Sequence, residues 1–370
     1  MPRGPRGTRT TSGTRAARRR PWAVVVGLDI GDRYSHFYVL DPDGEYVEEG
    51  RVGTLRDAMA RWARGLPPAR IVLESSTHSP WLSRLFHQLG HEVIVANTRR
   101  LKLIAHNDSK SDRVDAELLA RLGRVDPQLL APVQHRREET QVALAQLRTR
   151  DALVRARTQL INHVRGTVKA IGERLPKCGA EVFARRMPAV LPPALAPHLQ
   201  PVVEEIGRLT HLIRAADRQS EQLVATTYPE AQALMQVAGV GALTALCFIL
   251  TLEDPARFPT SRAVGSYVGL RPRMRASSGR DPECHITKAG DVLLRRLLVG
   301  SAHYILGPFG PDTDLRRWGL ALAARGRKAA KKRAVVAVAR KLAVLLHHLW
   351  QTQERYIPCR APARAVGQVA

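Results

Sequence analysis

The chain has 370 residues, of which 44% are hydrophobic, so it is long enough for roughly two or three folded domains. Its 58 Lys and Arg residues against 33 Asp and Glu give a formal net charge of +25, which favours a polyanionic partner, most simply nucleic acid. No apolar run approaches the roughly 18 residues that span a bilayer, so we expect no membrane partner.

The first segment, residues 1–20, contains seven Arg and no acidic residue among many Gly, Ser and Thr. This composition predicts a disordered basic arm that contacts phosphates without specificity. The apolar stretch Ala23–Leu28 follows a basic start, as in a signal peptide. It is too short for one, and Asp29 ends it.

The cysteines give no sign of a disulfide framework or of a structural zinc site. They are scattered and share no Cys-x-x-Cys spacing, which favours a reducing compartment, the cytoplasm. Their positions are Cys178, Cys247, Cys284 and Cys359.

Residues 21–133 alternate strand and helix patterns and form the first predicted domain. Short apolar runs predict the strands, and an Asp-Pro-Asp-Gly turn joins the second strand to the third. Apolar residues at helical spacing predict the helices. The predicted strands cover 23–30, 35–42, 46–54, 69–76 and 91–97, and the predicted helices 55–64 and 79–90. Such alternation is typical of an α/β domain.

Residues 134–227 change to long helices and form the second predicted domain, a helical hairpin or coiled coil. The break between its two arms is the proline-rich stretch 174–197. A heptad seam runs along both arms, and two helices of one chain or two copies of the chain would produce the same pattern. The seam residues are Leu147, Val154, Ile161 and Val168, then Val202, Ile206, Leu209, Ile213, Ala216, Ser220 and Leu223.

Residues 228–350 form the third predicted domain, which is mainly helical, and residues 351–370 form a tail. The Gly239–Gly241 turn between apolar helical segments is similar to a helix-hairpin-helix turn, whose backbone N–H groups can hold a phosphate. A simple tight turn explains the same residues. Residues 325–341 contain eight Lys or Arg and no acid, which predicts a basic amphipathic helix.

Four acidic residues stand out in so basic a chain. Asp29 and Glu74 each close a predicted buried strand, and if those strands are parallel neighbours, both carboxylates lie at one edge of the sheet. Asp112 and Asp115 lie three apart at a predicted helix start, where a helix cap and a dipole effect would also explain them. A cluster of four carboxylates favours two hard divalent cations such as Mg²⁺. Two such ions about 4 Å apart clamp the attacking and leaving oxygens of a phosphodiester.

These acids and a second block of sequence resemble a known family. Asp29, Glu74, Asp112 and Asp115 match the D-E-D-D tetrad of the insertion-sequence transposases of family 110 and its 1111 subgroup. Residues 258–299 are similar to that family's carboxy-terminal transposase domain, with its G-L-x-P, S-G and I-x-K-x-G-D-x-x-L-R elements. The resemblance covers residues 21–310 and implies a RuvC-like, ribonuclease H-like fold for the first domain.

The resemblance also implies the activity, a recombinase that excises and inserts a mobile element in the bacterial cytoplasm, at the nucleoid. The tetrad would hold two Mg²⁺ ions, and Ser278 of the S-G element, with Ser277 beside it, would attack DNA and form a phosphoserine link. Its partners would be DNA, a bridge RNA from the element and further copies of the chain, as a homodimer or homotetramer. The basic residues expected to hold nucleic acid are Lys110, Arg113, Arg273, Arg275, Lys288 and Arg295.

Three alternatives stay open at this stage. Residues 24–41 imitate the first phosphate loop of actin-like sugar kinases, although no second D-x-G loop follows and the net charge is unusual for that class. A Holliday-junction resolvase would use the same carboxylates with water as the nucleophile. A non-catalytic DNA-binding scaffold would need the charge but not the acids.

Overall fold

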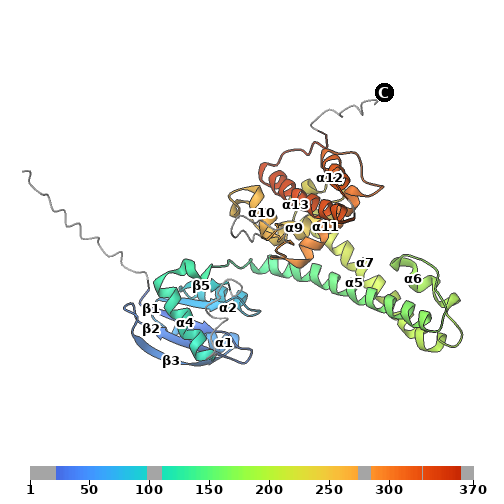
Figure 1. Cartoon of the computed structure of the whole chain (residues 1–370). Helices are drawn as coiled ribbons and strands as arrows, with labels where there is room; N and C mark the ends of the chain where they lie inside the picture. Colours follow the sequence, from blue (N-terminus) through green and yellow to red (C-terminus); the bar gives the residue numbers. More distant parts are fainter. Residues whose placement is uncertain (1–21, 98–110, 274–284, 327, 360–370) are drawn as a thin grey trace, which may run out of the picture. The chain divides into compact units, whose positions relative to one another are not determined.

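The computed structural model describes residues 22–97, 111–273, 285–326 and 328–359, and the chain divides into two compact units, Met1–Arg136 and Arg137–Ala370 (Figure 1). The first unit is α/β, and the second is helical. The predicted arm at 1–20 and the end of the predicted tail lie outside the described residues.

The first unit is built around a five-stranded mixed sheet with the strand order β3-β2-β1-β4-β5. Strands β1, β2 and β3 form an antiparallel meander, and β4 and β5 continue from β1 in parallel. The strands are β1 (Val24–Asp29), β2 (Tyr34–Leu40), β3 (Tyr46–Gly53), β4 (Ala69–Glu74) and β5 (Glu92–Ala96). The helices are α1 (Arg56–Arg64), α2 (Ser79–Gln88) and α4 (Asp112–Val125), followed by the short turn η1 (Pro127–Leu130). All seven elements predicted before residue 98 are therefore confirmed.

Both faces of the central strands are covered, which explains why β1 and β4 are almost continuously apolar. Val26 and Leu28 point to the face covered by α1 and α2, where they pack with Met59 and Phe86. The alternate residue Val25 points to the other face and packs with Leu119 of α4. The sheet is thus the middle layer of three.

Helix α4 lies unusually close to the sheet because glycine faces it. A Cβ added to Gly27 would lie 1.9 Å from the carbonyl oxygen of Ala116, so only glycine allows this approach. Further along α4, a Cβ on Gly123 would lie 2.3 Å from a methyl group of Val72. These two glycines fix the height of α4 above β1 and β4.

The second unit begins with two long helices, α5 (Glu138–Ala170) and α7 (Ala196–Thr226). They run antiparallel, since Arg150 pairs with Asp217 at 2.8 Å while Arg157 reaches the hydroxyl of Thr210 at 3.2 Å. The heptad seam therefore closes at least within one chain. Figure 1 shows the short helix α6 (Ala180–Arg186) at the end of this pair.

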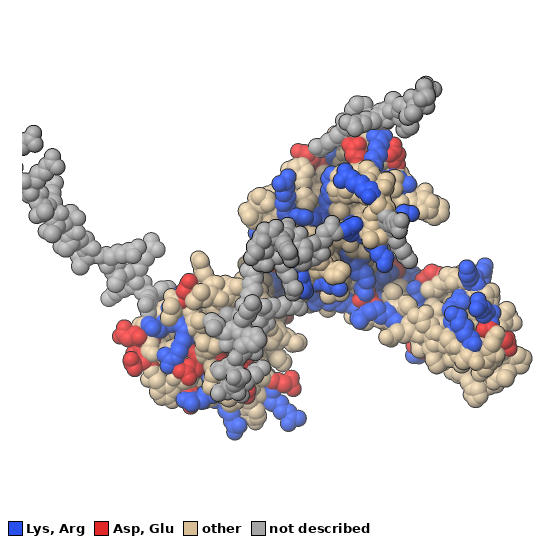
Figure 2. Space-filling model, in the orientation of Figure 1, with Lys and Arg blue, Asp and Glu red and all other residues tan. Residues whose placement is uncertain are grey.

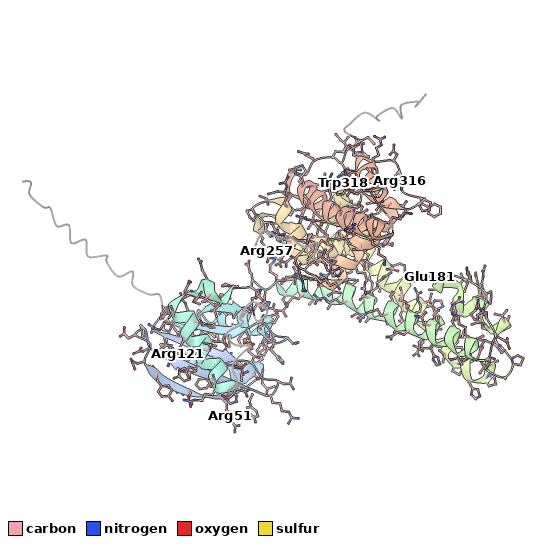
Figure 3. The ribbon with its side chains drawn as sticks, in the orientation of Figure 1. Arg51, Arg121, Glu181, Arg257, Arg316 and Trp318 are labelled. Atoms are coloured by element: carbon pink, nitrogen blue, oxygen red, sulfur yellow. The ribbon has the colours of Figure 1, made fainter. Side chains whose placement is uncertain are left out.

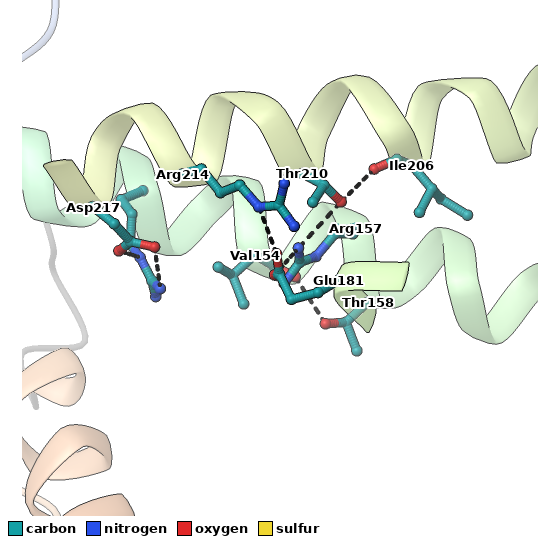
Figure 4. Close-up of polar contacts among 9 residues, drawn as sticks. Val154, Arg157, Thr158, Glu181, Ile206, Thr210, Arg214 and Asp217 are labelled. Atoms are coloured by element: carbon teal, nitrogen blue, oxygen red, sulfur yellow. Dashed lines mark hydrogen bonds and ion pairs between the residues drawn. The ribbon is translucent and has the colours of Figure 1, made fainter. Parts of the chain in front are cut away.

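A buried arginine ties α6 to the pair (Figure 4). Arg157 on α5 has a side chain only 9% exposed and donates to Glu181 of α6 at 2.6 Å, and Arg214 of α7 donates to the same carboxylate at 3.0 Å. The hydrogen bond from Arg157 holds the pKa of Glu181 below its ordinary value, against the effect of burial, and Arg214 adds to the shift. The three elements are thus joined by one carboxylate.

The remaining helices share one hydrophobic core, in which almost all residues of α9 are buried. They are α8 (Glu230–Leu234), α9 (Ala242–Leu252), α10 (Ser261–Tyr267), α11 (Val292–Leu306), α12 (Asp314–Ala324) and α13 (Lys328–Thr352), with the short turn η3 (Pro255–Arg257). The short turn η2 (Pro188–Val190) lies between α6 and α7. The basic stretch 325–341 lies largely in α13, and the side chains of Ala334 and Val338 are buried, as expected for an amphipathic helix. Within the described ranges, no helix has the length and apolar character to cross a membrane.

Candidate functional site

Asp29 and Glu74 lie at the same edge of the sheet. Strands β1 and β4 are parallel neighbours, and their last aligned pair is Leu28 with Leu73, so the two acids follow directly on both strands. The condition that the sequence left open, parallel adjacency of these strands, is confirmed. Because side chains alternate along a strand, Asp29 shares a face with Gly27, the residue that α4 contacts.

The direction of α4 brings its amino-terminal turn toward this edge. Arg70, near the start of β4, donates to the carbonyl oxygen of Gly123 near the end of α4 at 2.9 Å, so the helix runs opposite to the strand. Asp112 is its first residue, and Asp115, which is 6% exposed, is the buried acid of its first turn. The same packing that buries α4 therefore carries both acids toward the carboxyl ends of β1 and β4.

A histidine of the neighbouring strand lies beside both Asp29 and Asp112. His36 is the cross-strand partner of Asp29 in the β1–β2 ladder, and its Nε2 lies 3.5 Å from Oδ2 of Asp112. The side chain of Asp112 is 70% exposed. Sequence reasoning did not single out His36, since nothing marks a lone histidine in a strand until its neighbours are known.

The capping explanation for Asp112 is wrong. Ser111 is the N-cap residue of α4, with extended backbone, and its hydroxyl accepts the N–H of Val114 at 3.3 Å. Asp112 and Asp115 still lie in the first helical turn, where the helix dipole favours acids. Glu117 lies beyond this turn and pairs with Arg121 at 2.7 Å. The side chain of Arg121 is 52% exposed and is labelled on α4 in Figure 3.

The donor chemistry of the four carboxylates fits a hard divalent cation, because all the ligand atoms would be oxygens. Asp115 supplies a buried carboxylate, whose desolvation a cation would offset. Across the described residues, however, no three His, Cys, Asp or Glu side chains lie close enough together to hold a metal ion. The backbone thus gathers the acids at one edge, while their side chains do not converge on a point.

Ser278 and Ser277 lie outside the described residues, as does Arg275, but the ends of their segment are described. The N–H of Arg273 donates to the carbonyl of His285 at 3.0 Å, and Pro272 pairs with Ile286 in an antiparallel bridge. The chain therefore leaves and re-enters the described structure at neighbouring points.

Two glycines fix the base of this segment, and they belong to the G-L-x-P and I-x-K-x-G-D elements. Gly269 has φ +74 and Gly290 has φ +76, a left-handed backbone that favours glycine. A Cβ on Gly269 would lie 2.0 Å from the oxygen of Ala289, and one on Gly290 would lie 2.1 Å from the oxygen of Tyr267. In the sequence these two glycines could be recognised only as members of the two motifs. Their left-handed backbone and close contacts are seen only in the structure.

The basic candidates differ in their surroundings. Arg113 is paired with Glu49 at 2.7 Å, and that hydrogen bond raises its pKa. Arg295 donates to the carbonyl oxygens of Val268 at 3.2 Å and Ala289 at 2.8 Å, so it braces the loops around the two glycines. Arg273 and Lys288 are exposed, and Lys110 lies outside the described residues.

Comparison with known proteins gives two family matches and several relatives. A DEDD-type transposase model for IS110 matches residues 26–172, and a model described as transposase, IS116/IS110/IS902 family, matches residues 231–311. The transposase for insertion sequence element IS1328 of Yersinia enterocolitica is 28% identical over 288 residues, which are 76% of this chain and 84% of that protein. The transposase for insertion sequence element IS1111A of Coxiella burnetii is 28% identical over 338 residues, 90% of this chain and 91% of that protein.

Proposed function

Because the chain belongs to the IS110 family of transposases, enzymes that cut and rejoin DNA, we propose that it excises and inserts a mobile element through a carboxylate tetrad and a serine nucleophile. The tetrad consists of Asp29, Glu74, Asp112 and Asp115, and the nucleophile is Ser278. The observation that carries this proposal is the packing of α4, which brings two acids to the sheet edge where two strands end on acids. We further propose that the first unit is ribonuclease H-like.

The four carboxylates would hold two Mg²⁺ ions. When bound, such ions supply positive charge to the phosphate oxygens and lower the pKa of an attacking hydroxyl. Nε2 of His36 lies 3.5 Å from Oδ2 of Asp112. His36 would therefore keep the carboxylate of Asp112 oriented toward the end of β1, where Asp29 lies.

Ser278 would act as the covalent nucleophile. Its Oγ loses a proton and forms a bond to phosphorus, while the bond from phosphorus to a deoxyribose oxygen breaks and that oxygen takes a proton. A hydroxyl of the exchanging strand then attacks the phosphoserine, and Ser278 regains its proton. One phosphodiester is conserved at each step, so the exchange needs no external energy source.

The remaining roles follow from the family. We propose that the exposed basic residues hold DNA and a bridge RNA mainly through phosphate contacts. Recombination between two DNA molecules favours a homodimer or homotetramer. A chain with these partners would act in the bacterial cytoplasm at the nucleoid. We also propose a three-part functional division, with the tetrad in 21–133, a helical pair in 134–227 and the serine in 228–350.

A covalent-trapping assay tests this proposal. The full chain is incubated with labelled element-end DNA, Mg²⁺ and RNA from the element flank, and protein–DNA adducts are separated under denaturing conditions. The wild type should form an adduct, and Ser278→Ala and Asp115→Asn should both abolish it. The matched control Glu117→Gln, which changes an acid of the same helix, should keep it.

Other outcomes reassign the chemistry. An adduct that survives Ser278→Ala and disappears in Ser277→Ala moves the nucleophile by one residue. Cleavage that depends on Asp115 and never gives an adduct contradicts the serine mechanism and supports a resolvase that uses water.

A further inference from the structure

A cavity of about 470 Å³ lies in the second unit, between the start of α9 and one side of α11. Its lining from α9 includes the Gly239–Gly241 turn and Thr244, and its lining from α11 includes Arg296, Gly300 and Ser301. None of the described residues that line it is acidic. The guanidinium of Arg296 and the hydroxyls of Thr244 and Ser301 can all donate hydrogen bonds, so the cavity suits an anion.

At the start of α9, backbone N–H groups can donate hydrogen bonds to a ligand because no side chain caps the helix. Gly241 is the N-cap residue, no side-chain hydrogen bond caps the helix, and the first turn holds no acid. The first N–H groups of an α-helix have no partner within the helix, and the helix dipole makes this end positive. Gly239, at φ +83, turns the chain so that this end faces the cavity lining.

Two largely buried residues with hydroxyl groups add an independent observation. Thr244 is 7% exposed and Ser301 is 5% exposed, and both line the cavity. Among the described residues, no hydrogen-bond partner is seen for either hydroxyl. An acceptor inside the cavity would give both hydroxyls a partner.

Arg296 supplies a full positive charge and is held in place. Its guanidinium pairs with Asp151 of α5, which is 16% exposed and also pairs with Arg155 at 3.3 Å. One carboxylate therefore positions two arginines and leaves a net positive charge. A second cavity of about 420 Å³ shares Arg296, and its lining also includes Asp151, Arg150 and Arg155. Arg150 pairs with Asp217 of α7 at 2.8 Å.

The two cavities thus form one basic track on either side of Arg296. Lys and Arg side chains gather along this part of α5 in Figure 2. A small anion would fill only the first cavity. A nucleic acid strand carries a row of phosphates, which would meet Arg296 where the two cavities adjoin and Arg155 in the second cavity.

We propose that the cavity between α9 and α11 binds a backbone phosphate of the nucleic acid substrate, and that the adjoining cavity along α5 takes the next part of the same strand. This inference rests on the proposed function, which supplies the nucleic acid. It assigns a binding role to Thr244, Ser301 and Arg296, none of which the tetrad or the serine segment contains.

A pair of glycine substitutions tests the site. Gly300 lines the cavity in the middle of α11, and Gly166 lies within α5, near its carboxyl end. Both are exposed, and a Cβ on either meets no atom within 4 Å. Gly300→Glu places a negative charge at the cavity, and Gly166→Glu is its matched control. Glutamate favours helix over glycine, so neither variant should lower the melting temperature.

Binding of the full chain is measured by fluorescence anisotropy at several salt concentrations. The probes are a 30-base-pair duplex DNA of random sequence and a single-stranded RNA of equal length. Gly300→Glu should weaken binding by about tenfold or more, and the slope of log affinity against log salt should fall by about one. Gly166→Glu should bind like the wild type. Arg296→Gln should reproduce the loss of slope.

Each result decides one question. Weakening for DNA alone, for RNA alone or for both identifies the strand that enters the cavity. Wild-type affinity in Gly300→Glu, or equal weakening in Gly166→Glu, overturns the inference while leaving the proposed function intact. If the wild type itself binds neither probe, the proposed function fails instead.

Discussion

Replacing Gly27 by alanine should disturb the tetrad without touching any of its members. The new Cβ would lie 1.9 Å from the oxygen of Ala116 and 2.6 Å from the nitrogen of Ala120, both backbone atoms of α4. Ordinary contact begins near 3.4 Å, so α4 has to withdraw from β1 by about 1.5 Å. Asp112 and Asp115 move with it, because they belong to the same helix.

The expected magnitudes follow from this displacement. Overpacking of this kind costs about 1–3 kcal/mol of folding free energy, which a domain of this size can tolerate. A misplacement of about 1 Å at a catalytic centre lowers the rate by about 100-fold. Gly27→Ala should therefore remain folded at the assay temperature and lose far more activity than stability.

The assay compares melting temperature with the Mg²⁺-dependent, single-turnover cleavage rate of element-end DNA. The control is Gly53→Ala in β3 of the same sheet, whose Cβ would meet Ala58 at 3.7 Å, an ordinary contact. This control should cleave at the wild-type rate. A folded Gly27→Ala variant that also cleaves at the wild-type rate would show that the height of α4 does not set the site.

Three further predictions concern other parts of the chain. Gly269→Ala forces a left-handed backbone on alanine and a contact of 2.0 Å with Ala289, so it should destabilise the second unit by about 1–2 kcal/mol or more in a denaturant titration. Glu181→Gln leaves the buried guanidinium of Arg157 without its anion and should cost about 1–3 kcal/mol in the same measurement, whereas E230Q, which lies outside this network, should not. Burial, followed by nearby positive charge, lowers the pKa of His135. Because the unfolded state then binds the proton more readily, stability should be constant above about pH 6.5 and fall as the pH drops below it, and H135N should flatten that slope.

The strands and the sheet edge could be predicted because their signals are local. Asp29 and Glu74 each end an apolar strand. A carboxylate is costly to bury there unless it is paired or binds a cation, so its presence indicates a functional site. The close approach of α4 was not predictable, since Gly27 and Ala116 are far apart in sequence. The choice of Ser111 over Asp112 as the cap also required backbone geometry, because both residue types cap helices well.

In the second unit, too, features that depend on neighbouring residues could be predicted, whereas features that depend on residues far apart in the sequence could not. The heptad spacing predicted the seam, and Ile206 and Ile213 are buried there, but spacing alone does not say which helix fills the other side. The pairing of Arg296 with Asp151 joins residues 145 positions apart and has no local signature. The cavity beside Arg296 therefore became visible only in the folded chain.

The central proposal is that the acids at the sheet edge bind divalent cations, and Mn²⁺ binding tests it most directly. Mn²⁺ takes the same oxygen ligands as Mg²⁺ and can be followed by electron paramagnetic resonance in the full chain without DNA. The wild type should bind Mn²⁺, Asp115→Asn should lose about tenfold or more in affinity, and Glu117→Gln should match the wild type. Equal Mn²⁺ affinity in the wild type and Asp115→Asn would contradict the account.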